Sequence, residues 1–244
     1  MDVVTSPANH SDASLFSTYL HNFKKVENWY RYHPEIGFDA VLTKRAGDSG
    51  FRNTLADILI QQNAAWESTE ATMKNIEALR DQNTFAIVTG QQAGIFGGPL
   101  YTIYKTITVL KLCKELQNQY PDKKFVPVFW LEVNDSDFEE ISIVRYPTKE
   151  NSLRELKLDE QPEDVSKAVD SREIDADLQG WRSLLEEDFF DTEFKQQAID
   201  SYLNAYSYGG YTDGFARVLH GLFEKYGLVL INPAADEFSE LAKP

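Results

Sequence analysis

Short apolar runs alternate along the chain with longer stretches in which apolar residues recur at helical spacing. The three runs are residues 85–88, 126–131 and 228–231. Each run is too short for a helix and is rich in the branched and aromatic side chains that favour a buried strand. Helical spacing begins at Leu100, where Ile103, Ile107 and Leu110 share one face. Strand, helix and strand in this order predict a βαβ unit with parallel strands and a right-handed crossover.

The remaining sequence divides into four regions around this unit. We expect an N-terminal helical region at 1–83 packed on the core, the first βαβ part of the core at 84–147, an acidic and mainly helical insertion at 148–210, and a return helix and strand at 211–244. The helical patterns cover 52–66, 68–81, 177–190, 192–208 and 211–225, and a further strand pattern covers 141–146. Residues 148–175 have dense charge and no apolar run, so we interpret them as an exposed insertion without core strands.

A segment with four glycines joins the first run to the following helix. Glycine lets the backbone approach a ligand closely, and a helix N-terminus favours negative charge. Pro99 fits the first helical position. The segment therefore predicts a site for a phosphate or carboxylate, and its candidate residues are Gly90, Gln91, Gln92, Gly94, Gly97, Gly98 and Lys105. It matches neither the Walker A loop nor the dinucleotide fingerprint. The alternative to an anion site is a turn that only packs the helix on the sheet. For Lys105 the alternative is a solvated position on the surface.

An acidic loop follows the second run, with Asp135 and Asp137 as candidate catalytic residues. Loops that leave parallel strands at their carboxyl ends lie at one edge of the sheet, so this loop and the glycine segment are expected to face one cleft. The carboxylates could bind an ammonium group, coordinate a divalent cation or act as a general base. The alternative is structural, because Asp137 and Glu140 have the spacing of a helix-capping pair.

Composition restricts the classes of partner and compartment. The formal net charge is −15, and residues 132–200 alone hold 21 Asp and Glu against 8 Lys and Arg. Such a charge argues against nucleic acid and acidic membranes as partners. No apolar segment is long enough to cross a bilayer, and the N-terminus lacks a signal-peptide pattern, which predicts a cytoplasmic protein. The single cysteine, Cys113, excludes an internal disulfide and fits a core position.

Histidine and cysteine spacing gives no sign of a metal site. The four histidines are His10, His21, His33 and His220. They are scattered, so we predict no metal ligands among them. His220 falls in the apolar part of its helix and is expected to be a satisfied core or boundary residue.

Three motifs in order carry a family resemblance. They are residues 89–105, residues 126–130 followed by 134–140, and Tyr226-Gly-Leu-Val-Leu-Ile-Asn-Pro233. Together they resemble the bacillithiol biosynthesis cysteine-adding enzymes, the cysteine ligases, over the whole chain. The resemblance implies an α/β, Rossmann-like and nucleotidyltransferase-like core with a mostly parallel sheet and helical insertions. It also implies a cytoplasmic ligase that joins cysteine to glucosaminyl-malate, with a nucleotide (ATP or ADP) as a possible cosubstrate and no metal assigned.

Members of this family run to roughly twice this length and carry a coiled-coil arm used for homodimerisation. The chain is therefore expected to be an N-terminal part with an incomplete C-terminal half. Ser136 replaces the histidine that is common between the two aspartates, and Asn134 and Asn232 replace acidic residues. A histidine acid or base is thus missing at this loop. The competing hypothesis is a non-catalytic fragment or a nucleotide-binding or anion-binding module.

Overall fold

The computed structural model describes residues 14–33, 38–45, 50–135, 137–160, 164, 167–174 and 176–242. Ser136 and His10 lie outside these ranges, so the expectations for them are not addressed by the structure. The chain divides into two compact units, residues 1–46 and residues 47–244, which are described separately.

The first unit contains short helices. They are α1 (Leu15–His21), the 3-10 helix η1 (Phe23–Lys25) and α2 (Asp39–Arg45). Ser14 caps α1, because its side chain accepts a hydrogen bond from the amide of Ser17. The Tyr19 ring contacts the rings of Phe23 and Tyr30. The described residues of this unit are thus helical at 15–21, 23–25 and 39–45, whereas residues 26–33 form turns and bends.

A three-stranded parallel sheet organises the second unit. Its strands are β1 (Thr84–Gln92), β2 (Lys124–Glu132) and β5 (Val229–Ile231), in the order β1-β2-β5. All three predicted runs are strands, and the βαβ unit is confirmed. β1 is longer than predicted, because Gly90, Gln91 and Gln92 continue its pairing with β2 as far as Glu132. These three residues thus belong to the strand rather than to the loop after it.

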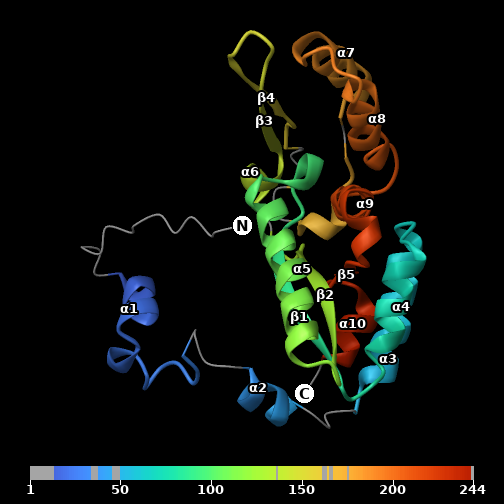
Figure 1. Ribbon diagram of the computed structural model, residues 1–244. Helices are drawn as coiled ribbons and strands as arrows, with labels where there is room; N and C mark the ends of the chain where they lie inside the picture. The colour runs from blue at the N-terminus through green and yellow to red at the C-terminus, as the bar shows by residue number, and fades with distance from the viewer. Residues whose placement is uncertain are drawn as a thin grey trace. The chain divides into compact units, whose positions relative to one another are not determined.

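Helices cover both faces of this sheet (Figure 1). Helix α5 (Tyr101–Gln119) packs on β1 and β2. The opposite face is covered at β2 and β5 by α3 (Arg52–Ala65) and α4 (Glu70–Ala78), with α10 (Asp236–Leu241) beside α3. The architecture is therefore an α/β sandwich, as the alternation of strand and helix patterns predicts. On β1 this second face is less covered, and the Val88 side chain is 55% exposed.

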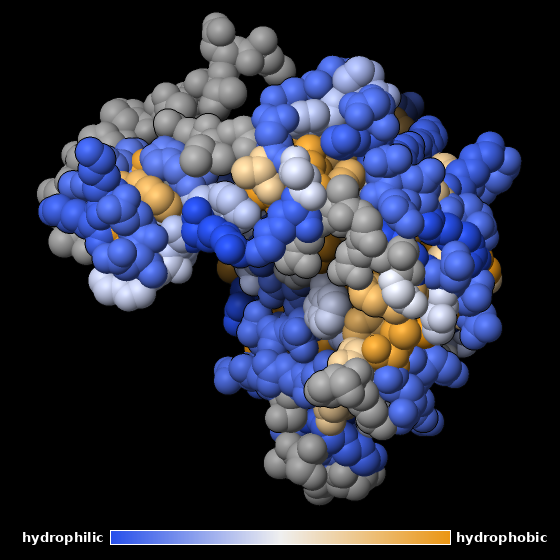
Figure 2. Space-filling view, turned by 90° about the horizontal axis from the view of Figure 1, so that it is seen from below, coloured by the Kyte–Doolittle hydropathy of each residue, from blue (hydrophilic) through white to orange (hydrophobic). Residues whose placement is uncertain are grey.

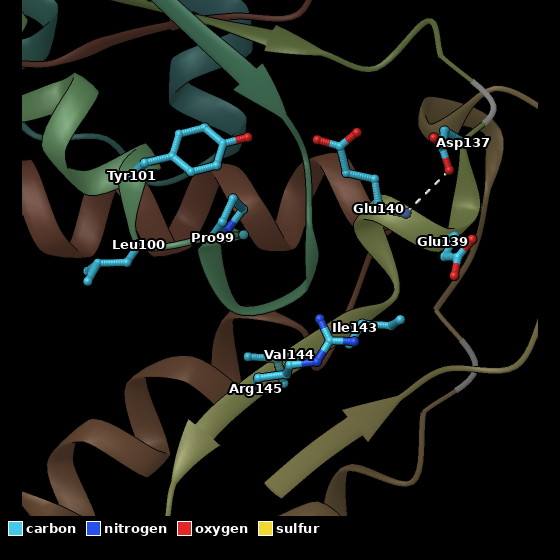
Figure 3. A pocket seen from close by; sticks show the side chains of 10 residues that line it. Pro99, Leu100, Tyr101, Asp137, Glu139, Glu140, Ile143, Val144 and Arg145 are labelled. Atoms are coloured by element: carbon cyan, nitrogen blue, oxygen red, sulfur yellow. Dashed lines mark hydrogen bonds between the residues drawn. The ribbon is translucent and has the colours of Figure 1, made fainter. Parts of the chain in front are cut away.

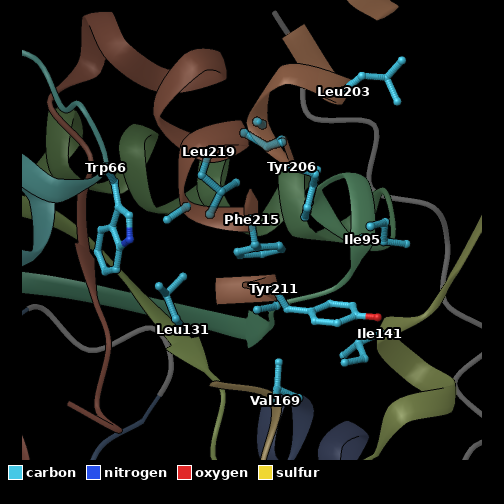
Figure 4. Packing of buried hydrophobic residues seen from close by; sticks show 14 of the residues in the cluster. Trp66, Ile95, Leu131, Ile141, Val169, Leu203, Tyr206, Tyr211, Phe215 and Leu219 are labelled. Atoms are coloured by element: carbon cyan, nitrogen blue, oxygen red, sulfur yellow. The ribbon is translucent and has the colours of Figure 1, made fainter. Parts of the chain in front are cut away.

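The larger hydrophobic core lies between the sheet and helices that include α5 and α9. Figure 4 shows Leu131 of β2 facing Phe215 and Leu219 of α9 (Tyr211–Phe223), with Val169 nearby. A smaller core joins the other face of β2 to α3 and α4 through residues such as Val128, Leu59 and Ile76. Burial of these side chains on two faces fixes the position of β2 in the middle of the sheet.

The buried face of α5 is shifted relative to the sequence prediction, because Ile103 and Leu110 pack against the larger core but are only partly buried. Its buried residues are Thr102, Thr106, Val109, Cys113 and Leu116. Ile107, which the apolar pattern placed on the inner face, is 39% exposed. Threonine can occupy the inner face because the Thr106 hydroxyl donates to the Thr102 carbonyl one turn earlier. The core position predicted for Cys113 is confirmed.

The prediction that residues 148–175 lack core strands is wrong. Strand β4 (Leu153–Lys157) pairs antiparallel with β3 (Ile143–Pro147), and the 3-10 helix η4 (Val169–Ser171) follows. Leu156, Leu158 and Val169 are buried in the larger core. A search for continuous apolar runs misses such a strand, because a half-buried strand alternates charged and apolar residues.

Helices α7 (Leu178–Asp188) and α8 (Lys195–Ala205) complete the insertion, and α7 lies beside the β3–β4 hairpin in Figure 1. The Tyr146 hydroxyl donates to Asp188, and Arg154 forms an ion pair with the same carboxylate at 2.7 Å. Burial and this hydrogen bond raise the pKa of Tyr146. The helix α9 leads through η5 (Glu224–Tyr226) to Gly227, which has φ of +65° and ends the helical stretch as predicted.

The surface is mostly hydrophilic on the face shown in Figure 2, with hydrophobic residues gathered in smaller areas. Among the described residues, no helix is long and apolar enough to span a membrane.

Candidate functional site

The glycine segment forms a tight turn between β1 and α5. It contains the 3-10 helix η2 (Ile95–Gly97), and three successive residues, Phe96, Gly97 and Gly98, have φ of +53°, +87° and +70°. Glycine adopts such angles at no steric penalty, whereas Phe96 is strained. Helix α5 begins at Tyr101, two residues after Pro99. The prediction that Pro99 is the first helical residue is therefore wrong, because the first bond, from the Thr102 amide to the Pro99 carbonyl, closes a tighter turn.

Several amides of the turn are used inside the protein. The amide of Gly94 donates to the Gln92 carbonyl at 2.9 Å, and that of Gly98 donates to the Ile95 carbonyl at 3.1 Å. The Gly97 amide donates to the Tyr206 hydroxyl at 3.4 Å. Anion binding by this segment stays a prediction, and it has to use donors other than these three amides.

The Tyr206 side chain fixes the glycine turn by hydrogen bonds and by ring packing. Its hydroxyl donates to the Gly94 carbonyl at 3.0 Å as well as accepting from the Gly97 amide. Its ring contacts Phe96, which also packs edge-on against Trp181 and Tyr202. Burial raises the pKa of the Tyr206 hydroxyl, so it stays protonated as a donor. Packing from α7 and α8 thus keeps Phe96 in its strained conformation.

Gly90 is required for a different reason, a close approach between strands. A Cβ atom at this position would lie 2.8 Å from the Trp130 carbonyl oxygen of β2. The strand pairing of Gly90 with Trp130 leaves no room for a side chain. The glycines of this segment therefore serve the strand, the turn and its packing in separate ways.

Two adjacent glutamines connect β1 to the acidic loop. The Gln91 amide donates to the Glu140 carboxylate at 3.2 Å, and the Gln92 amide donates to the Asp135 carboxylate at 2.7 Å. Successive strand residues point to opposite faces of a sheet. The acidic loop is therefore held from both sides of β1, which confirms that the ends of β1 and β2 lie together.

Lys105 completes this connection from α5. Its ammonium group donates to the Gln91 side-chain oxygen at 2.9 Å and to the Gly90 carbonyl at 3.2 Å, and it lies over the Tyr101 ring at 4.8 Å. Lys105 is half-buried rather than a solvated surface residue. A chain of contacts thus runs from Lys105 through Gln91 to Glu140.

The two predicted catalytic aspartates build the acidic loop. One oxygen of Asp135 accepts from the Gln92 amide group, and the other accepts from the Asp137 backbone amide at 3.1 Å. Asp137 caps α6 (Phe138–Ile141) by accepting from the Glu140 amide at 3.3 Å. The capping alternative for Asp137 is thereby observed. It does not exclude a chemical role, because Asp137 is exposed.

An open cavity of about 560 Å³ lies between the glycine turn and α6 (Figure 3). We call it the Tyr101 cavity. It is lined by Gly98, Pro99, Leu100 and Tyr101 on one side and by Asp137, Glu139, Glu140, Ile143, Val144 and Arg145 on the other. In Figure 3 the Glu140 carboxylate and the Tyr101 ring point toward one another, whereas Glu139 points away. The cavity combines apolar surface with carboxylates.

A second, shallower hollow of about 720 Å³ lies at the carboxyl ends of β1 and β2. We call it the Trp130 hollow. Its lining residues are Val88, Thr89, Gly90, Gln91, Gln92, Trp130, Glu132 and Asp135. The predicted site residues are thus divided. Gly98 and Asp137 line the Tyr101 cavity, and four others, Gly90, Gln91, Gln92 and Asp135, line the Trp130 hollow. Gly94 and Gly97 are buried within the turn, and Lys105 lines neither space.

Asp170 lies at the same sheet edge and was missed by the sequence analysis. One of its oxygens accepts from Thr212 and from the Asn232 amide, each at 2.8 Å. Its backbone amide donates to the Val133 carbonyl, and the preceding amide donates to the Asp135 carbonyl. No sequence signal distinguishes Asp170 from the other charges of its segment, because its position depends on contacts distant in sequence.

Arg172 anchors α6 from the same segment. It is buried, pairs with Glu160 at 2.8 Å, and lies over the Phe138 ring at 4.9 Å. A buried guanidinium that is paired in this way fixes the first residue of α6. Among the described residues, no group of three or more His, Cys, Asp or Glu is arranged to hold a metal ion.

The fold and this edge define a class of protein. The parallel sheet, the glycine turn leading into α5 and the polar residues at the carboxyl ends of the strands are those of a Rossmann-like domain. The chain belongs to the family described as "Bacillithiol biosynthesis BshC, N-terminal Rossmann-like domain", which matches residues 1–244. The predicted α/β, Rossmann-like fold and the predicted family are thereby confirmed.

Curated relatives agree with this assignment. A protein of Salinibacter ruber named "Putative cysteine ligase BshC" is 37% identical over 94% of this chain and 42% of its own length. Proteins of the same name from Chloroherpeton thalassium and Chlorobaculum tepidum are 32% and 33% identical over 98% and 97% of this chain, and each match covers 41% of the relative. The chain thus spans less than half the length of these relatives.

Proposed function

We propose that this chain forms the Rossmann-like part of a cysteine ligase that joins cysteine to glucosaminyl-malate. The observation that carries the proposal is the double connection between β1 and the acidic loop, Gln91 to Glu140 and Gln92 to Asp135, in a chain of this family. These two contacts bring the glycine segment and the acidic loop to the same edge of the sheet, where two substrates can be held together.

Amide formation from a carboxylate needs an activated acyl group, and a nucleoside triphosphate is the proposed source. The glycine segment and Lys105 form the proposed anion-binding side, with Gly90, Gln91, Gln92, Gly94, Gly97 and Gly98 shaping it. Asp135 and Asp137 form the proposed acidic side. Lys105 is suited to this role because an ammonium group close to the turn can neutralise developing phosphate charge.

The test uses the complete gene product that carries residues 1–244. It is incubated with cysteine, glucosaminyl-malate and ATP, and the cysteinyl product is measured by mass spectrometry. We expect product only when all three are present. Replacement of Lys105 by Met should lower kcat about a hundredfold, whereas Lys111→Met, an exposed lysine on the same helix, should leave it unchanged. Absence of product from the unaltered protein would contradict the proposal.

The competing function is a binding module without catalysis. The observation in its favour is the uncovered side of β1, where Ala86 and Val88 are exposed. Product formation by the complete protein distinguishes the two, because both functions would show nucleotide binding in calorimetry but only the ligase forms the cysteinyl product.

For the complete protein we also propose a cytoplasmic location and a homodimer formed through a coiled-coil arm. Light scattering of the complete gene product tests the dimer. A monomer at micromolar concentration would contradict it.

A further inference from the structure

Four carboxylates lie on the acidic loop and α6, and they differ in how their oxygens are used. Both oxygens of Asp135 accept hydrogen bonds from the loop and β1. Asp137 caps α6. Glu139 and Glu140 both line the Tyr101 cavity and are both exposed, but only Glu140 points toward Tyr101 (Figure 3). Glu140 is therefore the acidic side chain best placed to meet a molecule in this cavity.

Gln91 fixes the orientation of this carboxylate. The Lys105 ammonium group has only hydrogens to donate, so the Gln91 oxygen must face Lys105 and its NH₂ group must face Glu140. One Glu140 oxygen accepts this bond at 3.2 Å. The second Glu140 oxygen makes no hydrogen bond with the residues that the structure describes. It is therefore available to accept a hydrogen bond or a proton from a ligand.

The rest of the cavity suits a molecule with an amino group and an apolar or sugar-like face. Tyr101 and Leu100 are 45% and 66% exposed on the wall opposite α6. Among the described residues that line the cavity, Arg145 is the only cation, and it is paired with Glu155 at 2.6 Å. A carboxylate that is not neutralised by this arginine favours a nearby ammonium or amine.

We propose that Glu140 is the catalytic base that receives the proton of the acceptor amine in the Tyr101 cavity, and that Gln91 positions it. This inference rests on the proposed ligase function. The step uses the Glu140 carboxylate as the proton acceptor. The amine nitrogen attacks the acyl carbon of a donor activated as a mixed anhydride with phosphate. The C–N bond forms, the bond from the acyl carbon to the phosphate oxygen breaks, and phosphate leaves with that electron pair. The amine proton passes to Glu140.

The experiment compares Glu140→Gln with Glu139→Gln in the complete gene product. Both variants remove one negative charge from the lining of the same cavity, so they share any general electrostatic effect. Glutamine cannot accept the proton, and we expect Glu140→Gln to lower kcat by about 10² to 10⁴. We also expect it to lose the acidic limb of the pH profile of kcat. Glu139→Gln shares only the loss of charge from the cavity lining, so it should lower kcat by a much smaller factor than Glu140→Gln and keep that limb.

Gln91→Leu tests the positioning role. We expect a kcat about tenfold below that of the unaltered protein and an acidic limb displaced to another pH. A purely structural role would change the thermal midpoint but not the position of this limb. Equal kcat and equal pH profiles in Glu140→Gln and Glu139→Gln would overturn the inference while product formation by the unaltered protein still supports the ligase. Failure of the unaltered protein to form product would instead reject the proposed function itself.

Discussion

The glycine turn and the acidic loop meet at one edge of the sheet, but they are held in place by different forces. Gly94 and Gly97 are buried, and the turn around them is fixed by backbone geometry, by Tyr206 and by close packing. Asp135 and Asp137 are exposed and are held by hydrogen bonds within reach of water. Packing tolerates little change, whereas exposed polar contacts contribute little stability. Substitutions in the two loops should therefore have different consequences.

The largest loss of stability is expected for Gly97→Val. The residue has φ of +87°, and a Cβ atom would lie 3.1 Å from Val218 Cγ1. A left-handed conformation and overpacking together should lower the free energy of unfolding by about 3 kcal/mol. Urea denaturation measures this change. Gly221→Ala in α9 is the control, because its Cβ would meet no atom within 4 Å, and it should stabilise the helix by up to about 1 kcal/mol. Equal effects of the two variants would show that the turn is not under steric constraint.

Low pH should lower the free energy of unfolding through His220. This residue lies on α9, the helix that packs behind the turn, and both of its ring nitrogens are buried without a hydrogen-bond partner in the described structure. Its burial was predicted correctly, but its expected hydrogen-bond satisfaction was not. Burial lowers the pKa of His220 from 6.5 to about 4.

The unfolded chain then binds more protons than the folded one between these two pKa values, so stability falls as the pH drops below about 6.5. At pH 5 the loss should be about 2 kcal/mol relative to pH 8. His220→Phe removes the titrating group, and urea denaturation across this range should show a weaker dependence on pH for the variant. An unchanged dependence would assign the acid sensitivity to other groups.

Tyr206→Phe should have a smaller effect on the turn. The change keeps the ring but leaves the Gly94 carbonyl and the Gly97 amide without their partner. A buried polar group that loses its partner costs about 1 to 3 kcal/mol. Tyr202→Phe is the matched control, because its ring contacts Phe96 but its hydroxyl is not bonded to the turn. Thermal unfolding of both variants checks the difference, and equal midpoints would mean that the Tyr206 hydroxyl does not hold the turn.

The difference between the loops also explains what the sequence could predict. The strands β1, β2 and β5 follow from apolar runs, because burial on both faces selects such runs directly. Strand β4 and the shifted buried face of α5 could not be predicted, because a charged strand and the inward threonines Thr102 and Thr106 break the pattern that burial usually imposes. Local patterns reveal elements, but they do not reveal how elements are turned against one another.

The candidate site was predictable to a similar extent. Gln91, Gln92 and Asp135 could be placed at one sheet edge because parallel strands share their carboxyl ends. Their partners could not be assigned, since pairing of Gln92 with Asp135 and of Gln91 with Glu140 depends on the path of the loop. Tyr206 lies 112 residues from Gly94 in sequence, and nothing local marks it as a contact of the turn.

The smallest change in stability is expected for Gln92→Leu, which acts on the acidic loop alone. The hydrogen bond to Asp135 is exposed, so its loss should lower the free energy of unfolding by less than about 1 kcal/mol. The local effect should be larger than the global one, because this contact ties the loop to β1. Hydrogen exchange of the amides of 137–140 should become several times faster, while exchange of the amides of β2 stays unchanged. If loop exchange is unaffected, the acidic loop is held by Asp170 and its neighbouring backbone contacts rather than by β1, and the two loops are then less closely coupled than their hydrogen bonds suggest.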